Sequence, residues 1–341
     1  MKKVLVALAI MWENIKSYVI AIVLTVAILI ALSSIIHNVL KIRELYVEDN
    51  SGNKSFVTVD ENRMNVKVMG TGEQTVVILS DFAESSPVLK YKTYADKLSE
   101  NYRVVIIEYF GYGYSLSTKN DRTNYEFATE INNALIAAEV NGPYIFLATG
   151  TSSMYVYTYA NLYANNVQKL VIVDGIYPSS IKDKYTQKYV EDLVTNSSIT
   201  TVAEFSGYAR ILSYVKADIF HIDQMVDLGY SKEDIKLYRK MIASRYYTET
   251  MRREIKKLEE NMNELQDYVY PDYLEVTQIL STGYIEEVKA LNEAKKTDIS
   301  LETYANNMIT NSEIQNIIKI EGKKSNLSLD NPEEVVNAIM N

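Results

Sequence analysis

The chain has 341 residues, no cysteine and a net charge of −9 at pH 7. Without cysteine it cannot form disulfides, thiolate metal sites or a cysteine nucleophile. The acidic balance argues against a nucleic-acid partner, because phosphate binding needs clustered Lys and Arg. The only histidines are His37 and His221, and without a His/Cys cluster we expect neither a metal nor a cofactor.

The segment Tyr18–Ile36 contains no charged residue. A helix of this length can cross a hydrocarbon core of about 30 Å, because each residue adds about 1.5 Å. The apolar segment Val4–Trp12 resembles the start of a signal sequence, but the second, longer run favours an uncleaved, single-pass anchor. We therefore expect the lipid bilayer as a partner through Tyr18–Ile36, and we interpret His37 as an interfacial residue.

The charges that flank this span indicate its orientation only slightly. Lys2, Lys3 and Lys16 precede it, while Lys41 and Arg43 follow it. A short N-terminal segment before a long domain is typical of a signal anchor. We therefore predict a cell-membrane protein whose bulk domain is extracytoplasmic.

Short apolar runs after the anchor alternate with amphipathic segments. The segments Phe56–Asp60 and Met64–Met69 predict a hairpin that turns at residues 61–63. Strands are expected at Val76–Leu79, Val104–Ile107, Tyr144–Ala148 and Leu170–Val173, and helices at Val88–Leu98, Tyr125–Val140 and Met154–Tyr163. Buried strands that alternate with helices predict an α/β fold with a mostly parallel, doubly wound sheet.

From Pro178 to Tyr270 the pattern changes to helices only. Within Thr248–Tyr268, apolar residues recur at spacings of four and three, which predicts an amphipathic helix lying on the domain. Strand signals return at Leu274–Leu280 and Ile314–Ile320, each followed by a helix. We therefore divide the chain into an N-terminal segment (1–44, with the span at 18–36), a first core part (45–177), a helical cap insertion (178–270) and a second core part (271–341).

A motif that follows one predicted strand resembles a known family. Residues Glu108–Ser115 read EYFGYGYS, which is similar to the D-x-x-G-x-G-x-S turn of the α/β-hydrolase family. Four further segments match in order and spacing: Gly142–Ile145, Tyr159–Asn161, Leu170–Asp174 and Asp330–Val335. The resemblance covers about residues 57–340, and it implies an eight-stranded-type, mostly parallel sheet with a helical cap.

The resemblance also implies a nucleophile at a sharp strand–helix turn of the form G-x-S-x-G. After Tyr144–Ala148 the chain reads TGTSS, and the register places Gly150 in the nucleophile position. Glycine suits strained backbone but supplies no nucleophile. Ser152 is a fallback, although Met154, two residues later, is too large for such a turn.

The family's histidine base should follow the last strand, where this chain has Ser325 and Ser328. A serine cannot act as a general base near neutral pH. His221 lies in the helical insertion, so it would have to fold over the site from the cap. We interpret it as a surface or core-edge residue.

The family's His-Gly oxyanion motif is replaced by Ser80 and Asp81. If Asp81 points into the cleft, its carboxylate would repel a developing anion. Asp174 ends a strand, and we interpret it as structural.

Three hypotheses follow. The first is a membrane-tethered protein without hydrolase activity that binds an unknown small molecule or protein at the cleft or cap. The second is an active hydrolase, esterase- or peptidase-like, with a relocated nucleophile near Ser152. The third is an assembly protein that dimerises through the anchor or the Thr248–Tyr268 helix.

Overall fold

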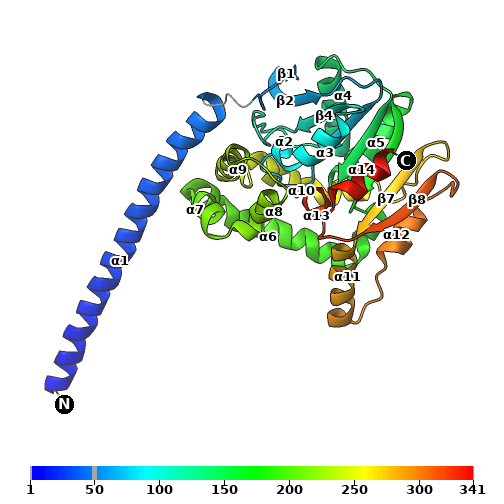
Figure 1. The fold of residues 1–341 in the computed structure, drawn as a ribbon. Helices are drawn as coiled ribbons and strands as arrows, with labels where there is room; N and C mark the ends of the chain where they lie inside the picture. The colour runs from blue at the N-terminus through cyan, green and yellow to red at the C-terminus, as the bar shows by residue number, and fades with distance from the viewer. Residues whose placement is uncertain (1, 48–51, 341) are drawn as a thin grey trace.

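A long N-terminal helix projects from a folded domain (Figure 1). The computed structural model describes residues 2–47 and 52–340. Helix α1, Lys2–Ile42, has 41 residues and continues into a short π-helical turn, η1, Arg43–Val47. Its segment Ile15–Leu45 is long and apolar enough to cross a membrane, and the most apolar stretch has no buried residue. The predicted span Tyr18–Ile36 therefore lies on a helix whose apolar side chains are not covered by the domain.

The domain is built on one eight-stranded sheet with the order β1-β2-β4-β3-β5-β6-β7-β8. Strands β3 to β8 pair in parallel, whereas β2 is antiparallel to both β1 and β4. The strand bounds are β1 Phe56–Val59, β2 Asn62–Met69, β3 Thr75–Leu79, β4 Arg103–Glu108, β5 Tyr144–Thr149, β6 Val167–Val173, β7 Glu275–Ser281 and β8 Gln315–Ile320. The predicted doubly wound, mostly parallel sheet is therefore present.

The hairpin β1–β2 turns one residue earlier than the sequence indicates. Val59 pairs with Asn62, so Asp60 and Glu61 form a two-residue loop. Both have positive φ, at 47° and 63°. Two successive left-handed residues make the turn whose twist matches that of the flanking strands.

The turn after β4 explains the EYFGYGYS motif. The buried Glu108 carboxylate accepts hydrogen bonds from the Tyr114 N–H (2.8 Å) and the Asn65 side-chain amide (2.9 Å). Burial raises the pKa of Glu108, and these hydrogen bonds oppose the rise. A Cβ atom on Gly113, which has φ +45°, would lie 1.9 Å from that carboxylate, so only glycine fits there. Hydrogen bonds to Glu108, the first residue of the motif, therefore hold the turn in place.

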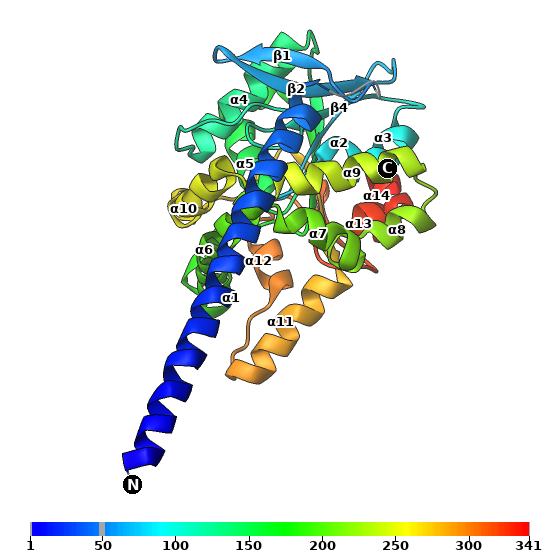
Figure 2. The same cartoon turned by 90° about the vertical axis from the view of Figure 1, so that its left-hand side faces the viewer.

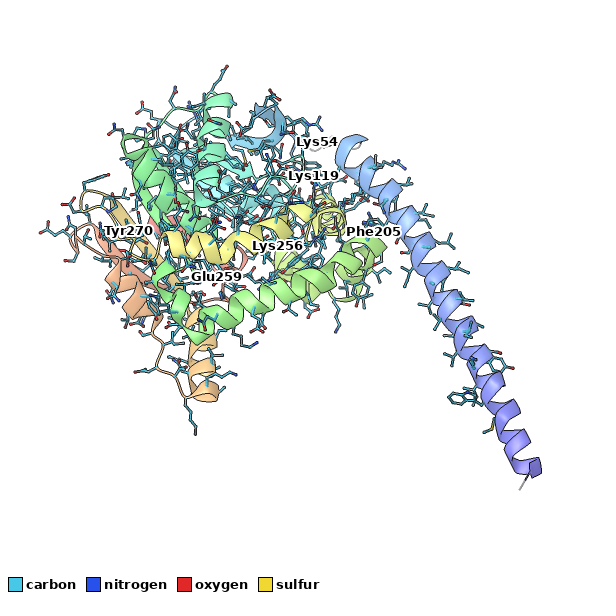
Figure 3. All side chains as sticks on the ribbon, turned by 180° about the vertical axis from the view of Figure 1, so that it is seen from behind. Lys54, Lys119, Phe205, Lys256, Glu259 and Tyr270 are labelled. Atoms are coloured by element: carbon cyan, nitrogen blue, oxygen red, sulfur yellow. The ribbon has the colours of Figure 1, made fainter. Side chains whose placement is uncertain are left out.

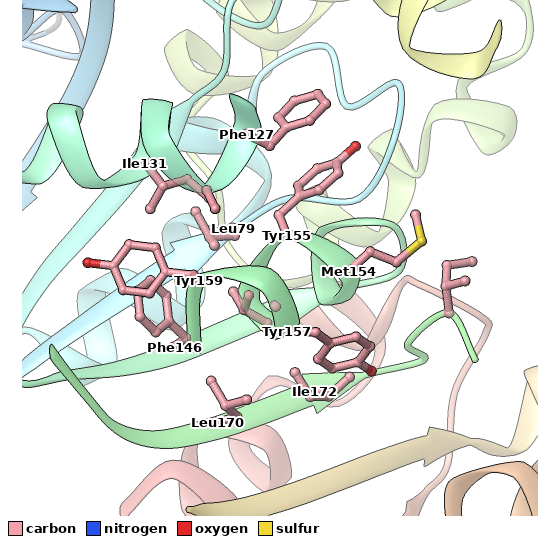
Figure 4. Close-up of a cluster of buried hydrophobic side chains, with 14 of the residues drawn as sticks. Leu79, Phe127, Ile131, Phe146, Met154, Tyr155, Tyr157, Tyr159, Leu170 and Ile172 are labelled. Carbon is pink, nitrogen blue, oxygen red and sulfur yellow. The ribbon is translucent and has the colours of Figure 1, made fainter. Parts of the chain in front are cut away.

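Helices cover both faces of the sheet. On one face, α4 (Asn124–Ala137) and α5 (Ser152–Leu162) bury aromatic and aliphatic side chains against β5 and β6, as Figure 4 shows. On the other face, α3 (Lys92–Leu98) and α14 (Pro332–Met340) pack on β3 and β4. The strands between them are buried on both sides, which is why they read as unbroken apolar runs.

Between β6 and β7 the described residues form helices only. They are η3 Pro178–Lys182, α6 Lys184–Ser206, α7 Tyr208–Val215, η4 Ala217–Phe220, α8 Ile222–Asp227, α9 Lys232–Arg245 and α10 Glu249–Glu264. The Ser231 and Thr248 side chains cap α9 and α10, because they accept from the N–H groups of Asp234 and Met251. A third core cluster joins this cap to Leu45, Leu89, Tyr114 and Leu329 from outside it.

Two helices differ from the sequence expectation. The predicted helix at Val88–Leu98 is divided at Tyr91 into α2 (Pro87–Lys90) and α3. Between β7 and β8 the chain forms α11 (Thr282–Lys295) and also a short α12 (Leu301–Asn307). Lys296, with φ +54°, ends α11, and the Ser300 side chain caps α12. A short α13, Leu327–Asp330, precedes α14.

Candidate functional site

The turn between β5 and α5 has the form that a nucleophile would require. Gly150 stands between Thr149, the last residue of β5, and Ser152, the first residue of α5. Its φ is +56°, and its N–H donates to the carbonyl of Val173 at 3.0 Å. An L-residue is strained at this φ, so the backbone itself favours glycine.

The carboxylate of Asp81 occupies the space above Gly150. A Cβ atom on Gly150 would lie 2.0 Å from Asp81 Oδ1 and 2.1 Å from its Cγ. The same Oδ1 accepts from the N–H of Thr151 at 2.9 Å and from the N–H of Phe82 at 2.7 Å. The Thr151 hydroxyl adds a longer contact at 3.3 Å. Asp81 therefore holds two backbone donors that converge on one point.

These two donors have a specific meaning in the fold that the sequence resembles. There, the N–H of the residue after the nucleophile and an N–H from the loop after the third strand bind the developing oxyanion. In this chain Thr151 follows Gly150 and Phe82 lies in the loop after β3, and the N–H groups of both donate to the Asp81 carboxylate. Ser80, the other residue of the altered motif, is buried, and its hydroxyl has no hydrogen-bond partner among the described residues.

The fallback nucleophile Ser152 is fully buried. Its hydroxyl donates to the Thr149 carbonyl (2.8 Å), lies 3.2 Å from the Leu79 carbonyl, and accepts from the Thr149 N–H (2.9 Å). Ser153 is also buried, and its hydroxyl accepts from the Ile176 N–H at 2.9 Å. Both hydroxyls stabilise the strand–helix turn and do not face an open space.

Asp174 organises the loop that should carry the base. Its carboxylate accepts from the N–H of Ser281 and from the N–H of Ser325, each at 2.7 Å. Burial raises the pKa of Asp174, and these hydrogen bonds oppose the rise. It thus ties the ends of β6 and β7 to the loop after β8.

Ser325 and Ser328 lie where the histidine base is expected, but a serine cannot act as a general base near neutral pH. Ser325 has a left-handed backbone (φ +53°), and Ser328 lies in α13. Their hydroxyls are buried and have no hydrogen-bond partner among the described residues. That either serine faces Gly150 across the cleft stays a prediction.

His221 lies on the contact between the cap and this loop. Burial and then the nearby charge of Lys90 lower the pKa of His221 from its ordinary 6.5 to about 4. One turn on, Gln224 donates to Asp330, and its amide oxygen accepts from Asn326 at 3.1 Å. His221 therefore lies next to a group of polar side chains, Gln224, Asn326 and Asp330, whose hydrogen bonds connect α8 to the core.

Helix α10 closes the space over Gly150. Its Glu254 carboxylate accepts from the hydroxyls of Tyr155 (2.7 Å) and Tyr112 (2.9 Å) and lies 3.5 Å from Arg122. Arg122 pairs with Glu130 at 3.0 Å and stacks on Phe127 at 4.1 Å from the ring centre. Burial raises the pKa of Glu254, while Arg122 and the two tyrosines oppose the rise. This buried network locks the cap to the core.

Little space remains between α10 and the turn that carries Thr151. A cavity of about 10 Å³ is left between the core and α10, lined by Phe82, Thr151, Tyr155, Glu254, Ile255, Leu258 and Asn261. That volume holds one water molecule at most. Side chains of α10 and of the core therefore take up most of the space beside Thr151 and Phe82.

A larger hollow lies on the cap itself. A groove of about 350 Å³ between η3, α6 and α10 is lined by Ile181, Gln187, Val190, Glu191, Val194, Thr195 and Glu259. Glu259 stands on α10 above α6 in Figure 3. The lining combines apolar side chains with two carboxylates, Glu191 and Glu259. Among the described residues, no group of three or more His, Cys, Asp or Glu side chains could hold a metal ion.

Sequence reasoning did not identify the residues that close the cleft. Glu254 interrupts the apolar face that Met251, Ile255 and Leu258 define on α10. A charged residue on the buried face of a helix signals a buried partner. The partner itself, Arg122, is 132 residues away in the sequence, and only the fold brings the two together.

No protein-family model matches this chain. A protein of uncharacterised function from Bacillus subtilis strain 168, YbdG, is 26% identical over 123 residues, which are 36% of this chain and 38% of that protein. The match therefore spans well under half of that relative.

Solved structures resemble nearly the whole domain. Cfl2 from Burkholderia cenocepacia superposes with a TM-score of 0.61 at 14% identity, covering 86% of this chain and 97% of that one. The epoxide hydrolase VrEH1 from Vigna radiata gives 0.62 at 14% identity, with 86% and 98% covered. The esterase EaEST from Exiguobacterium antarcticum gives 0.56 at 15% identity, with 84% and 98% covered. At such low identity these likenesses concern the fold alone.

Proposed function

We propose that this chain, which has the α/β-hydrolase fold, is a membrane-anchored protein that lacks hydrolase activity and acts by binding a ligand or partner. The observation that carries the proposal is the position of Asp81. Its carboxylate takes both the space of a nucleophile side chain at residue 150 and the two N–H donors of the oxyanion site.

The charge of Asp81 is incompatible with the chemistry of acyl transfer. Donors that bind a developing oxyanion stabilise the transition state by several kcal/mol, about 3–4 for one donor. A resident carboxylate consumes these donors and adds a negative charge beside the reacting centre. In a serine protease, loss of the nucleophile or of the base alone lowers kcat by about 10⁶. This chain has Gly150 where the nucleophile is expected, and Ser325 and Ser328 where the histidine base is expected.

The alternative is a hydrolase that uses Ser152. The burial of that hydroxyl and its three contacts with backbone groups argue against it. A nucleophile also needs a base within about 3 Å, and the Ser152 hydroxyl is bonded only to backbone carbonyl and N–H groups of Leu79 and Thr149.

The anchor is the second part of the proposal. The uncharged span Tyr18–Ile36 is exposed along α1 and matches the thickness of a bilayer. We place the domain on the extracytoplasmic side, as the signal-anchor pattern favours. With the former cleft filled, the cap surface is the better place for a ligand or protein partner, and its groove of about 350 Å³ has the size of a small-molecule site.

Hydrolysis of activated esters by the full-length chain in detergent tests the catalytic part. We expect the wild type to be no faster than Ser152→Ala, because neither carries a working nucleophile. A fluorophosphonate probe should label neither Ser152 nor Ser153, which mass spectrometry of the wild type can determine without any variant.

Two results would overturn the proposal. One is esterase activity that disappears in Ser152→Ala while the variant keeps its fold. The other is covalent labelling of either serine in the wild-type chain.

A further inference from the structure

The cap carries an exposed apolar surface beside the anchor. Six large apolar side chains from the end of α6 to η4 are each between 51% and 69% exposed. We name them the outer cap face: Phe205, Tyr208, Ile211, Tyr214, Val215 and Ile219. Exposed apolar surface of this continuity marks an interaction site.

Helix α7 is amphipathic with its apolar face turned outward. Ala209 and Ser213 are buried, and α7 packs on α9. Tyr208, Ile211 and Val215, at spacings of three and four, point away from the domain. In a globular protein the apolar face of such a helix would normally be the buried one.

The outer cap face is joined directly to α1. The Ser33 hydroxyl donates to the Ser206 carbonyl at 2.7 Å. The His37 side chain lies against Gly207, where an added Cβ would come within 2.9 Å of it and where φ is +74°. In Figures 1 and 2 the helices α6 and α7 lie next to α1, and Figure 3 shows Phe205 on the side of the domain that faces it.

Ion pairs hold the two parts in this arrangement. Glu44 accepts two hydrogen bonds from Arg210, both 2.7 Å long, and one from Ser244 at 3.0 Å. Lys41 pairs with Glu204 at 2.9 Å. The bidentate Arg–carboxylate geometry is specific as well as strong.

These contacts determine the depth of the outer cap face relative to a membrane. The apolar span ends at Ile36, and the residues that hold Ser206 and Gly207 are Ser33 and His37, within one turn on either side. One helical turn is about 5 Å. Phe205 and the start of α7 therefore lie near the level where the hydrocarbon core gives way to lipid head groups, while Arg210 reaches Glu44, beyond the end of the span.

We infer that the outer cap face lies in the head-group boundary of the bilayer that α1 crosses, so that the cap is a second, interfacial contact with lipid. This inference rests on the proposed anchor. Aromatic and branched aliphatic side chains suit that depth, because their apolar bodies face acyl chains while the tyrosine hydroxyls reach head groups. The occupant is lipid, since the contacts with α1 leave this surface beside the span.

The chain has no cysteine, so single-cysteine variants of the full-length protein can be labelled at one site each. We would place a bimane fluorophore at Ile211→Cys and Val215→Cys, in phosphatidylcholine vesicles with and without brominated acyl chains. Leu24→Cys reports on the anchor. The matched control is Ile136→Cys on α4, an exposed apolar residue outside the cap.

We expect strong quenching by brominated lipid at Leu24, about twofold quenching at Ile211 and Val215, and none at Ile136. Quenching at Leu24 with cap labels that behave like Ile136 would overturn the inference and leave the anchor intact. Cap fluorescence that depends on protein density but not on bromine would also overturn it, in favour of contact with a second copy. An unquenched Leu24 would instead reject the anchor.

Discussion

At the scale of single residues, Asp81 and Gly150 depend on each other. The carboxylate fits because residue 150 has no side chain, and the glycine tolerates φ +56° while the carboxylate satisfies the neighbouring N–H groups. Restoring a serine at residue 150 therefore meets two obstacles, strain and overlap, before the lack of a base is considered.

A double-mutant cycle measures this dependence. Gly150→Ala should lower the free energy of unfolding by about 2–4 kcal/mol, because it combines backbone strain with overlap of Asp81. In the background of Asp81→Ala the loss should be smaller by about 1–2 kcal/mol, because the overlap is gone. Asp81→Asn is the matched control, since it keeps the size of the side chain and should not relieve Gly150→Ala. Additive losses in urea denaturation would contradict the packing described above.

The lowered pKa of His221 predicts a pH dependence. Unfolded His221 takes up a proton below its ordinary value of 6.5, but in the folded protein it does so only near a pKa of about 4. The contribution of neutral His221 to the free energy of unfolding is therefore complete above pH 6.5 and is lost as the pH falls from 6.5 towards 4.

His221→Asn should reduce this acid sensitivity. Asparagine does not titrate, and it tolerates the positive φ of 56° at this position. We expect the drop in Tm between pH 7 and pH 4.5 to be smaller in the variant than in the wild type. An equal drop in both proteins would show that His221 does not contribute.

At the scale of elements, the cap is fastened at two places. Helix α10 is held to the core by the network around Glu254, and α6, α7 and α9 are held to α1 through Glu204, Arg210 and Ser244. A lid that admits substrate must move, often at hinge residues. The buried Glu254 of α10, which pairs with Arg122 and accepts from the Tyr112 and Tyr155 hydroxyls of the core, favours a closed cap instead.

Substitutions on α10 test this fastening. Glu254→Ala should lower the free energy of unfolding by about 3 kcal/mol, since it leaves the Tyr155 and Tyr112 hydroxyls without their carboxylate acceptor and leaves Arg122 with Glu130 as its one buried carboxylate partner among the described residues. Glu254→Gln keeps an acceptor and should lose about half as much. Glu259→Ala, an exposed position on the same helix, should change stability by less than about 0.5 kcal/mol. Equal effects at residues 254 and 259 would mean that the network does not hold the cap.

At the scale of the whole molecule, α1 has two roles that truncation can separate. The α1 residues 15–32 are exposed and largely apolar, whereas Ser33 and His37 of α1 and Glu44 and Leu45 of η1 pack on the cap. Removing residues 1–32 should convert the protein from membrane-bound to soluble and keep the cap contacts.

Removing residues 1–54 should give a less stable protein. The cap would lose the partners of Arg210 and Ser244 and expose the surface that covers His37 and Leu45. We expect a lower Tm and faster proteolysis within α6–α9 than in the shorter truncation. Equal stability of the two truncated proteins would show that α1 only anchors. A protein lacking residues 1–32 that stays with membranes would show that this part of α1 is not needed for attachment and would point to the outer cap face.

The sequence by itself determined much of the architecture, because the signals are local. Unbroken apolar runs mark strands that are covered on both faces, and a period of 3.6 residues marks amphipathic helices. The sheet, the hairpin and the helical stretch from Pro178 all follow from neighbours within a few residues. Composition excluded cysteine chemistry, and the register placed Gly150 at the strand–helix turn.

The tertiary structure alone decided what lies beside Gly150 and what packs against the C-terminal end of α1. Thr151 and Asp81 are 70 residues apart, Arg122 and Glu254 are 132 apart, and Ser33 and Ser206 are 173 apart. Their meeting depends on strand order and on how the cap settles on the core, which no local period encodes. For this reason the sequence predicts only that Asp81 would oppose an oxyanion if its side chain pointed inward. The fold shows that its carboxylate accepts from the N–H groups of Thr151 and Phe82.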